Sequence, residues 1–215
     1  MTPIHAFTTT SRQGHVRAPK ALARLLKKQR WPAAIAIGQQ VHRAKIAIVP
    51  RLSTMHEYAG VDGLLTAQAH QPLGIFTADC VPVFLSAQKG AVVGLLHAGW
   101  RGVQSGIAAK AIRLVKTKWN IRAHDVQLWA GPSIGPCCFE VQWDVARYFP
   151  RSRQRQGKRW RVNLVAALQK QTVALGARWK STRVPCTMHT KDYFSFRRDA
   201  TAKRQVSLIM KKGSS

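Results

Sequence analysis

The sequence predicts an α+β fold: a single domain built as a mixed-sheet α/β sandwich. Short apolar runs bounded by Gly or Pro recur along the chain, which is typical of buried strands. Amphipathic stretches lie between them in irregular order, which favours a mixed sheet. The 215 residues, 46% of them hydrophobic, can bury a sizeable core. Because no linker or repeat divides the chain, we expect a single domain over residues 1–215, with residues 211–215 as a frayed tail.

Seven apolar runs are predicted as strands. Turn formers such as Gly and Pro lie at many of their ends. The runs cover residues 33–38, 45–50, 73–78, 81–87, 91–98, 126–131 and 204–210. The run AVVGLLHA at 91–98 ends in a histidine and then continues as GWRG, which indicates chemistry at the tip of this strand.

Four stretches are predicted as helices because apolar residues recur in them at helical spacing. They lie around residues 19–29 and within 102–119, 139–149 and 163–176. Asn163 is a good N-cap for the last of these, and Gly176 is a good terminator. Pro150 ends the stretch 139–149.

The charge balance is extreme: 35 Lys and Arg face 8 Asp and Glu, for a formal net charge of +27 and an isoelectric point near 11.5. Such a field attracts anions, including nucleic acid, phosphate and nucleotide-like substrates. The basic residues are spread along the chain, with one dense run at 151–161, and no zinc-finger or helix-turn-helix pattern accompanies them. We therefore expect nucleic-acid binding to be nonspecific at most. A general bias towards a basic surface is the alternative explanation.

Several classes of protein are excluded by composition. Eight carboxylates make a paired-carboxylate mechanism hard to build and nearly exclude a two-metal carboxylate site. No window of about 18 consecutive apolar residues is present, so we expect no membrane span. The first 20 residues lack the apolar region of a signal peptide, which predicts a cytoplasmic location.

The four cysteines are too few for a disulfide scaffold in a chain of this length. Cys137 and Cys138 are neighbours and could form a strained vicinal disulfide. They follow the turn-rich stretch GPSIGP, which we expect to open a helix whose N-terminus could attract an anion. Free thiols, metal ligation and catalysis all stay open for Cys80 and Cys186.

Three segments end in, or turn at, residues that can bind metals. They are QQVHRAKI with His42, FTADCVPV with Cys80 and LLHAGWRG with His97. Zinc binds His nitrogen and Cys sulfur, and a catalytic site supplies three protein ligands with a fourth position for water or substrate. Each residue also has a simpler interpretation, because a lone His is often just hydrogen-bonded and a lone Cys often fills the core.

The motifs QVH, VDGLLT, TADCVPV, HAGWRG, GPSIGPCCFEV and YFSFRRD, in that order, resemble the YfiH/laccase-domain family. Members of this family have been called multicopper polyphenol oxidoreductases or purine nucleoside phosphorylases. The resemblance runs from FTTT near Phe7 to RQVSLIM. It implies a single mixed α/β domain of the YfiH/laccase-domain type.

The resemblance also implies a site and an activity. The family's zinc ligands correspond to His42, Cys80 and His97, the same three residues that the strand ends present. The family activity is phosphorolysis of adenosine and inosine to the base and ribose 1-phosphate, and methylthioadenosine phosphorolysis and adenosine deamination are also attributed to it. The implied partners are a purine nucleoside and phosphate, with a monomer or a homodimer both open.

This chain departs from the family pattern in two places. Arg43 follows His42 where members usually have a glycine. The usual glycine-rich N-terminal stretch with a Ser-Leu-Asn motif is missing, and the chain runs from TTTSRQGHVRAPK directly into the predicted N-terminal helix. In the family that stretch contributes to the edge of the pocket, so its loss bears on substrate identity and rate more than on the metal site.

Arginines are the candidates for binding phosphate, because the planar guanidinium donates two hydrogen bonds at once. Arg101 lies next to the HAG turn in sequence, and Arg197 and Arg198 are second candidates. Asp79 precedes Cys80 and could accept a hydrogen bond from a ligand histidine, orient the sugar, or cap a turn. Gln40 and His189 are weaker pocket candidates.

Copper chemistry is the main alternative. A multicopper oxidase needs a blue-copper site and a trinuclear cluster, which together demand many more histidines than the eight present, and no His-x-His pair occurs. One Cys and two His suit one metal ion, for which Zn²⁺ is favoured and Cu²⁺ is the alternative. A polyphenol oxidase is therefore the second hypothesis, and a basic binding protein with impaired catalysis is the third.

Overall fold

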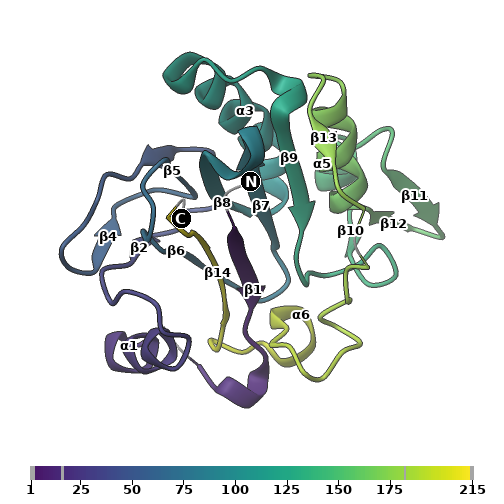
Figure 1. Ribbon diagram of the computed structural model, residues 1–215. Helices are drawn as coiled ribbons and strands as arrows, with labels where there is room; N and C mark the ends of the chain where they lie inside the picture. Colours follow the sequence, from purple (N-terminus) through teal and green to yellow (C-terminus); the bar gives the residue numbers. More distant parts are fainter. Residues whose placement is uncertain (1–2, 16, 182, 214–215) are drawn as a thin grey trace.

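The computed structural model describes residues 3–15, 17–181 and 183–213 and contains two large sheets and one small sheet (Figure 1). The five-stranded sheet has the order β1 (Ile4–Thr8), β14 (Gln205–Lys211), β6 (Leu73–Thr77), β2 (Ala36–Gly38) and β4 (His56–Tyr58). The six-stranded sheet has the order β13 (Arg178–Trp179), β9 (Val126–Ala130), β7 (Val81–Ala87), β8 (Val92–Ala98), β5 (Gly63–Thr66) and β3 (Ile46–Ile48). The three-stranded sheet has the order β10 (Glu140–Val141), β12 (Arg159–Val162) and β11 (Arg153–Gln156).

The helices are α1 (Pro19–Lys28), α2 (Trp100–Gln104), α3 (Ile107–Trp119), α4 (Trp143–Ala146), α5 (Leu164–Val173) and α6 (Phe196–Asp199). Short 3-10 turns occur at Ser11–Gln13, Gln88–Gly90 and Ala123–Asp125. In the described residues no helix is both long and apolar enough to cross a membrane.

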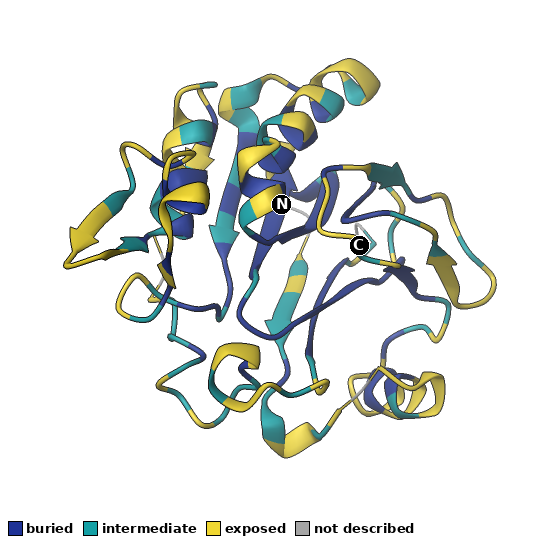
Figure 2. Cartoon of the chain, turned by 180° about the vertical axis from the view of Figure 1, so that it is seen from behind, coloured by how far each residue is buried: buried dark blue, intermediate teal, exposed yellow. Residues whose placement is uncertain are grey.

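The two large sheets pack face to face, and helices cover their outer faces. Alternation along β8 shows this arrangement: Leu95 belongs to the core between the sheets, whereas Leu96 belongs to the core under α3 and α5. On the other side, Leu22 and Leu26 of α1 pack on Phe76 of β6. The result is a helix–sheet–sheet–helix sandwich with buried strands and exposed outer helix faces (Figure 2).

The predicted fold class is confirmed, and the predicted elements are mostly present. The seven apolar runs contain β2, β3, β6, β7, β8, β9 and β14, and both large sheets mix parallel with antiparallel pairs. The helix at 163–176 is α5, in which the Asn163 side chain accepts a hydrogen bond from the Ala166 N–H as an N-cap. The stretch 102–119 holds the end of α2 and all of α3, separated at Gly106, which has φ +68°.

The helix predicted over 139–149 is wrong. Phe139 is followed by strand β10, and only the four residues of α4 are helical. Val141 and Val145 do face the core, as the helical spacing suggested, but Glu140 and Val141 pair with β12 instead of continuing a helix. The stretch GPSIGP therefore opens no helix, and Cys137 and Cys138 have no helix N-terminus beside them.

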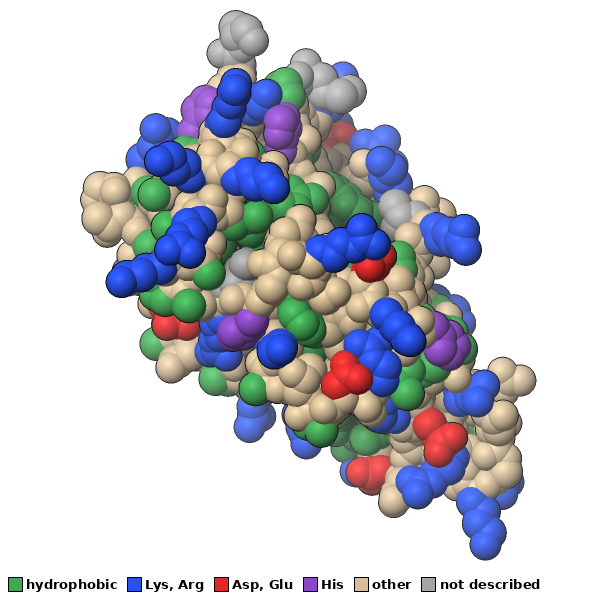
Figure 3. Space-filling view, turned by 90° about the horizontal axis from the view of Figure 1, so that it is seen from below, with side chains coloured by type: hydrophobic (Ala, Val, Ile, Leu, Met, Phe, Trp, Pro, Cys, Tyr) green, Lys and Arg blue, Asp and Glu red, His purple; other side chains and the backbone are tan. Residues whose placement is uncertain are grey.

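The dense basic run at 151–161 folds as a hairpin, although its sequence shows no clear strand pattern. Strands β11 and β12 are joined at Gly157, which has φ +57°. In β12, Arg159 and Arg161 alternate with Trp160 and Val162, whereas Arg153 of β11 lies opposite Val162 and stacks over Trp160. Seen from below, Lys and Arg are scattered over the surface with few Asp and Glu among them (Figure 3).

Strand pairing near the C-terminus extends into the segment that was predicted to be a frayed tail. Lys211 belongs to β14 and pairs with Ile4, and the Lys212 N–H donates to the Pro3 carbonyl at 2.9 Å. The predicted tail 211–215 is thus in regular pairing at its first residues, while residues 214 and 215 lie outside the described part of the chain.

Candidate metal centre and its cavity

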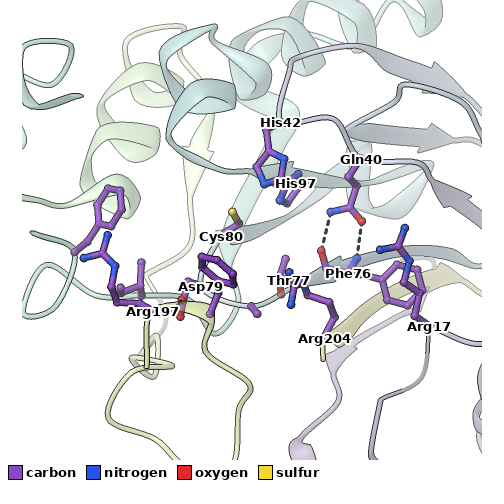
Figure 4. A pocket seen from close by; sticks show the side chains of 14 residues that line it. Arg17, Gln40, His42, Phe76, Thr77, Asp79, Cys80, His97, Arg197 and Arg204 are labelled. Atoms are coloured by element: carbon purple, nitrogen blue, oxygen red, sulfur yellow. Dashed lines mark hydrogen bonds between the residues drawn. The ribbon is translucent and has the colours of Figure 1, made fainter. Parts of the chain in front are cut away.

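Three segments bring His42, Cys80 and His97 together. His97 is the penultimate residue of β8, Cys80 directly precedes β7, and β7 and β8 are paired neighbours. His42 comes from the loop between β2 and β3. One ligand atom from each of the three residues can be chosen such that all lie within 4.8 Å of one another. The His42 and His97 rings lie edge to face with centroids 4.7 Å apart, above Cys80 in the cavity (Figure 4).

Asp62 holds two of these three residues in place, although no sequence pattern pointed to it. Its Oδ1 lies 2.8 Å from His97 Nδ1, and its two oxygens accept the backbone N–H groups of Val41, His42 and Arg43 at 3.3, 2.9 and 2.8 Å. His42 is thereby held at φ +58°, a left-handed conformation that is costly for a residue with a side chain. Asp62 is buried at the start of the VDGLLT motif, directly before β5.

The Asp62 contact also selects the form of His97. Because a carboxylate only accepts hydrogen bonds, Nδ1 of His97 carries the proton and Nε2 is the ring nitrogen that can bind a metal. Burial alone would raise the pKa of Asp62. The hydrogen bonds from His97 and from the Arg43 and Val41 N–H groups outweigh it and keep this pKa below its ordinary value, so Asp62 is an anion at neutral pH.

The pKa values of Cys80 and His97 favour a thiolate–imidazolium ion pair at neutral pH when no metal is bound. Burial favours the neutral thiol, but the positive charge of His97 and hydrogen bonds with His42 and His97 lower the pKa of Cys80 to about 6. Burial also favours neutral imidazole. The negative charge of Cys80 and the hydrogen bond to Asp62 outweigh it and raise the pKa of His97 to about 9.

We therefore expect the Cys80 thiolate to form unusually early in a titration of metal-free protein. Thiolate absorbance of the wild-type chain minus that of Cys80→Ser should rise as the pH passes about 6, since the difference isolates Cys80 from the other cysteines. An ordinary cysteine titrates at about 8.5. A difference signal that appears only above pH 8 would contradict the ion pair. A metal binds only an unprotonated ring nitrogen. The His97 pKa of about 9 therefore predicts that metal binding at pH 7 displaces the proton on Nε2 of His97.

Close packing explains why a glycine, Gly99, follows His97 and Ala98 in the HAGWRG motif. Its φ of −68° is open to any residue, so a turn is not the reason for glycine here. A Cβ at Gly99 would lie 3.1 Å from Cys80 Sγ and 3.2 Å from His42 Cδ2. A Cβ at Gly102 would lie 3.1 Å from the Arg43 carbonyl oxygen. Both glycines therefore allow the His42 loop to approach the end of β8.

The ligand group opens into a cavity of about 370 Å³, a size within the range of small-molecule sites. One part of its lining is apolar or aromatic, and another part is cationic. The lining residues beyond the ligand group are Arg17, Gln40, Phe76, Thr77, Ala78, Asp79, Ile134, Phe139, Phe196, Arg197 and Arg204. Phe196 is 57% exposed, so the cavity has an aromatic side chain at its mouth.

Gln40 and Asp79 both line the cavity, as predicted for pocket residues, and both also tie segments together. The Gln40 side chain makes two hydrogen bonds with the backbone of Phe76 (Figure 4). Its Nε2 donates to the Phe76 carbonyl at 2.7 Å, and its Oε1 accepts from the Phe76 N–H at 2.8 Å. Asp79 accepts hydrogen bonds from the Thr187 hydroxyl at 2.6 Å and from the Arg197 N–H at 2.7 Å. These bonds attach the C-terminal loop to the turn before β7 that carries Cys80. The carboxylate that accepts a hydrogen bond from His97 is that of Asp62 instead of Asp79.

The arginine candidates separate in space. Arg197 lies in the cavity wall, with its guanidinium 5.6 Å from the Phe139 ring centroid and Nη1 donating to the Glu140 carbonyl. Arg101 is not among the lining residues and stacks 4.3 Å over its neighbour Trp100. Arg198 bonds Asp199 and the carbonyls of Thr187 and Tyr193, and so holds the C-terminal loop. Arg17 and Arg204 also line the cavity, although no sequence motif pointed to them.

The donor set fits a metal ion. One thiol and two imidazoles are ligands that zinc and copper share, and no carboxylate of the kind that magnesium prefers lies in the group. Three ligands beside a cavity form the pattern of a catalytic rather than a closed structural site. Fold and site together define an α/β sandwich with a Cys/His group that can hold one metal ion beside a cationic, aromatic cavity.

Comparison with known proteins agrees with this class. Residues 7–212 match the family described as multi-copper polyphenol oxidoreductase laccase, and the chain belongs to this family. A purine nucleoside phosphorylase of Haemophilus influenzae is 28% identical, over 96% of this chain and 93% of that protein. The purine nucleoside phosphorylase YlmD of Geobacillus stearothermophilus is 40% identical over 53% of this chain, but the match spans only 42% of that protein.

Solved structures show the same fold. YlmD from Geobacillus stearothermophilus has a TM-score of 0.86 and 27% identity, with 98% of this chain and 92% of that chain covered. The YfiH protein of Bacillus licheniformis has a TM-score of 0.85 at 23% identity, with 96% and 92% covered. The resemblance to the YfiH/laccase-domain family is therefore confirmed.

Proposed function

We propose that this protein is a zinc-containing purine nucleoside phosphorylase that cleaves adenosine or inosine with phosphate. The observation that carries the proposal is the composition of one cavity, in which the His42–Cys80–His97 group lies beside arginines and aromatic side chains. The names of its relatives support it, because purine nucleoside phosphorylases are among them. A methylthioadenosine phosphorolysis and an adenosine deamination are further proposed reactions of the same cavity.

The lining residues divide into two groups that match the two substrates. Phe76, Phe139 and Phe196 offer apolar ring surface to a purine, and an arginine guanidinium lies over each ring, 5.6 to 6.0 Å from its centroid. Arg17, Arg197 and Arg204 offer guanidinium groups that pair with phosphate oxygens. The chain's high positive charge attracts the phosphate dianion towards the cavity.

In the proposed reaction a phosphate oxygen forms a bond to the anomeric carbon of the ribose while the bond from that carbon to the purine nitrogen breaks. The electron pair of the broken bond leaves with the purine, which then takes up a proton. Arginine side chains orient the phosphate and offset its charge, and the aromatic wall holds the base as it departs.

The cytoplasmic location stays a prediction.

His42, Cys80 and His97 would hold the zinc ion. When bound, zinc supplies a Lewis acid that stabilises negative charge. Asp62 is a positioning residue in this scheme, because it directs the Nε2 of His97 and fixes the His42 backbone without lining the cavity. Asp79 is a positioning residue for Arg197, whose backbone N–H it binds.

A direct assay tests the proposal. Untagged protein incubated with adenosine or inosine should release the free base and ribose 1-phosphate only when phosphate is present. Inosine formed from adenosine without phosphate would identify the deamination. Oxidation of a phenol by copper-loaded protein, without any nucleoside cleavage, would favour the polyphenol oxidase that the family description suggests. Failure of both assays with metal bound would favour the basic binding protein.

Arg197→Ala should raise the KM for phosphate about 10- to 100-fold, since a hydrogen bond to a charged group contributes about 1.5–3 kcal/mol. The expected change in the KM for the nucleoside is smaller, because Arg197 is assigned to phosphate. Steady-state kinetics with each substrate varied separately makes the measurement.

Arg101→Ala is the matched control, because both arginines are exposed and lie over an aromatic ring, but Arg101 does not line the cavity. Its phosphate KM should stay within about twofold of the wild-type value, as for other surface changes. The reverse pattern, with a large effect only for Arg101→Ala, would move the phosphate to the Trp100 side and refute the assignment.

A further inference from the structure

A second group of metal-binding side chains lies outside the cavity lining. It consists of Cys137, Cys138, Cys186 and His189, and one ligand atom from each can be chosen such that all lie within 4.8 Å of one another. The Cys138 Sγ lies 3.1 Å from His189 Nε2, and the Cys137 Sγ lies 3.8 Å from His189 Nδ1. All four cysteines of the chain, including these three, are free thiols.

Two loops far apart in the sequence form this group. The loop after β9 carries the two adjacent cysteines, and the loop after β13 carries Cys186 and His189. A parallel bridge between Ser133 and Cys186 joins the loops, with the Thr187 N–H donating to the Ser133 carbonyl at 3.1 Å. Cys186 and His189 then lie in one tight turn, in which the His189 N–H donates to the Cys186 carbonyl at 3.1 Å.

The ligands have the chemistry and the spacing of a closed zinc site. Three thiols and one imidazole make a Cys₃His set, which zinc binds tetrahedrally with four protein ligands. Zinc–sulfur bonds of about 2.3 Å place two sulfurs of a tetrahedron about 3.8 Å apart, so spacings up to 4.8 Å need only a small contraction. Hard ions such as Mg²⁺ and Ca²⁺ are disfavoured, because the group has no carboxylate or carbonyl ligand.

The backbone around the group is arranged for sulfur ligands. The Gly135 N–H donates to the Cys186 Sγ at 3.2 Å, a contact that supports a thiolate. A Cβ at Gly135 would lie 3.2 Å from the Cys137 Sγ and 3.5 Å from the Cys186 Sγ. Glycine at this position therefore lets the backbone approach two of the sulfurs closely.

We propose that Cys137, Cys138, Cys186 and His189 bind a second zinc ion as a structural site. Binding replaces the protons of the three thiols, which pass to solvent, and needs no oxidant or reductant. The site is separate from the proposed phosphorylase chemistry. It fixes a wall of the cavity, since the first loop also carries Ile134 and Phe139, which line it, and the second loop is joined to Asp79 through Thr187.

Metal analysis tests the proposal without an activity assay. Untagged full-length protein from zinc-supplemented cells should contain about two zinc ions per chain, one closed and one open site. Cys186→Ser and Cys80→Ser should each retain about one, and the double variant should retain none. Replacement by Co²⁺ in Cys80→Ser should give the intense sulfur-to-cobalt charge-transfer absorption of a three-thiolate site, and replacement in Cys186→Ser the weaker absorption of a one-thiolate site.

Three results would overturn the second site. One is a wild-type content of about one zinc that Cys186→Ser does not lower. Another is weak one-thiolate absorption from Co²⁺-loaded Cys80→Ser. The third is a count of only two free thiols in denatured, unreduced protein, which would identify a disulfide such as Cys137–Cys138. If Cys186→Ser fails to fold, the exposed pair Cys137→Ser and His189→Gln replaces it, and each should weaken zinc retention at this site while Cys80 keeps its ion.

Discussion

Cys80→Ser should remove the metal from the cavity and lower nucleoside phosphorolysis at least about 1,000-fold, because the loss of a metal's charge stabilisation costs several kcal/mol of barrier. Serine is close to cysteine in size, but its hydroxyl does not ionise near neutral pH and is a poor zinc ligand. Metal content of the cavity and kcat with adenosine or inosine make the measurement. The fold should survive, since the thiol lies beside a cavity rather than in the packed core.

A pair of histidine variants controls for the Cys80 result. His42→Gln removes a second member of the group and should cause a loss of the same kind. His56→Gln removes an exposed histidine of β4 that belongs to neither metal-binding group and should leave kcat unchanged. If Cys80→Ser loses the cavity metal but keeps phosphorolysis, then the metal is not part of the chemistry, and the proposed zinc enzyme is refuted.

Asp62→Asn should weaken zinc binding in the cavity about 10- to 100-fold, the usual effect of removing a carboxylate that orients a ligand histidine. Asparagine has one acceptor oxygen where the carboxylate has two, so it cannot serve His97 and all three N–H groups of residues 41–43 equally. The variant should also unfold more easily, by about 1–3 kcal/mol for each buried donor that loses its partner. Zinc competition with a chelator and thermal unfolding make the measurements.

Asp79→Asn is the matched control, because Asp79 is also a buried aspartate that accepts a backbone N–H and a side-chain hydrogen bond. Its contacts are to Thr187 and Arg197, so we expect a loss of stability with zinc affinity close to wild type. An equal loss of zinc affinity in both variants would show that general loosening, and not the contact with His97, explains the Asp62 effect.

The pKa of His97 gives a further test. It should change in Asp62→Asn if Asp62 acts on His97 directly, and it should not change if Asp62 only supports the fold. Without the full negative charge of Asp62, the pKa of His97 in the metal-free chain should fall below its value of about 9. Titration of the His97 ring signals by NMR in the metal-free wild-type and Asp62→Asn chains makes the measurement.

Local sequence patterns were sufficient for most of the framework. The strands β7 and β8 are continuous apolar runs, and such runs have few alternatives to a buried strand. The helix prediction for 139–149 was wrong because Val141 and Val145 lie at helical spacing. The conformation of Val141 is decided instead by its pairing with Trp160 of β12. The hairpin at 151–161 was hidden by its charge, since its partner strands show little hydrophobic alternation.

By itself the sequence was enough to indicate the candidate metal-binding side chains of the cavity, because His42, Cys80 and His97 belong to motifs beside apolar strands that can be recognised without a structure. Only the tertiary structure decided which other residues join them. Asp62 rather than Asp79 binds His97, and Arg197 rather than Arg101 lines the cavity. Such choices depend on contacts between segments distant in the chain, as between Asp79 and Arg197, and no local pattern encodes them.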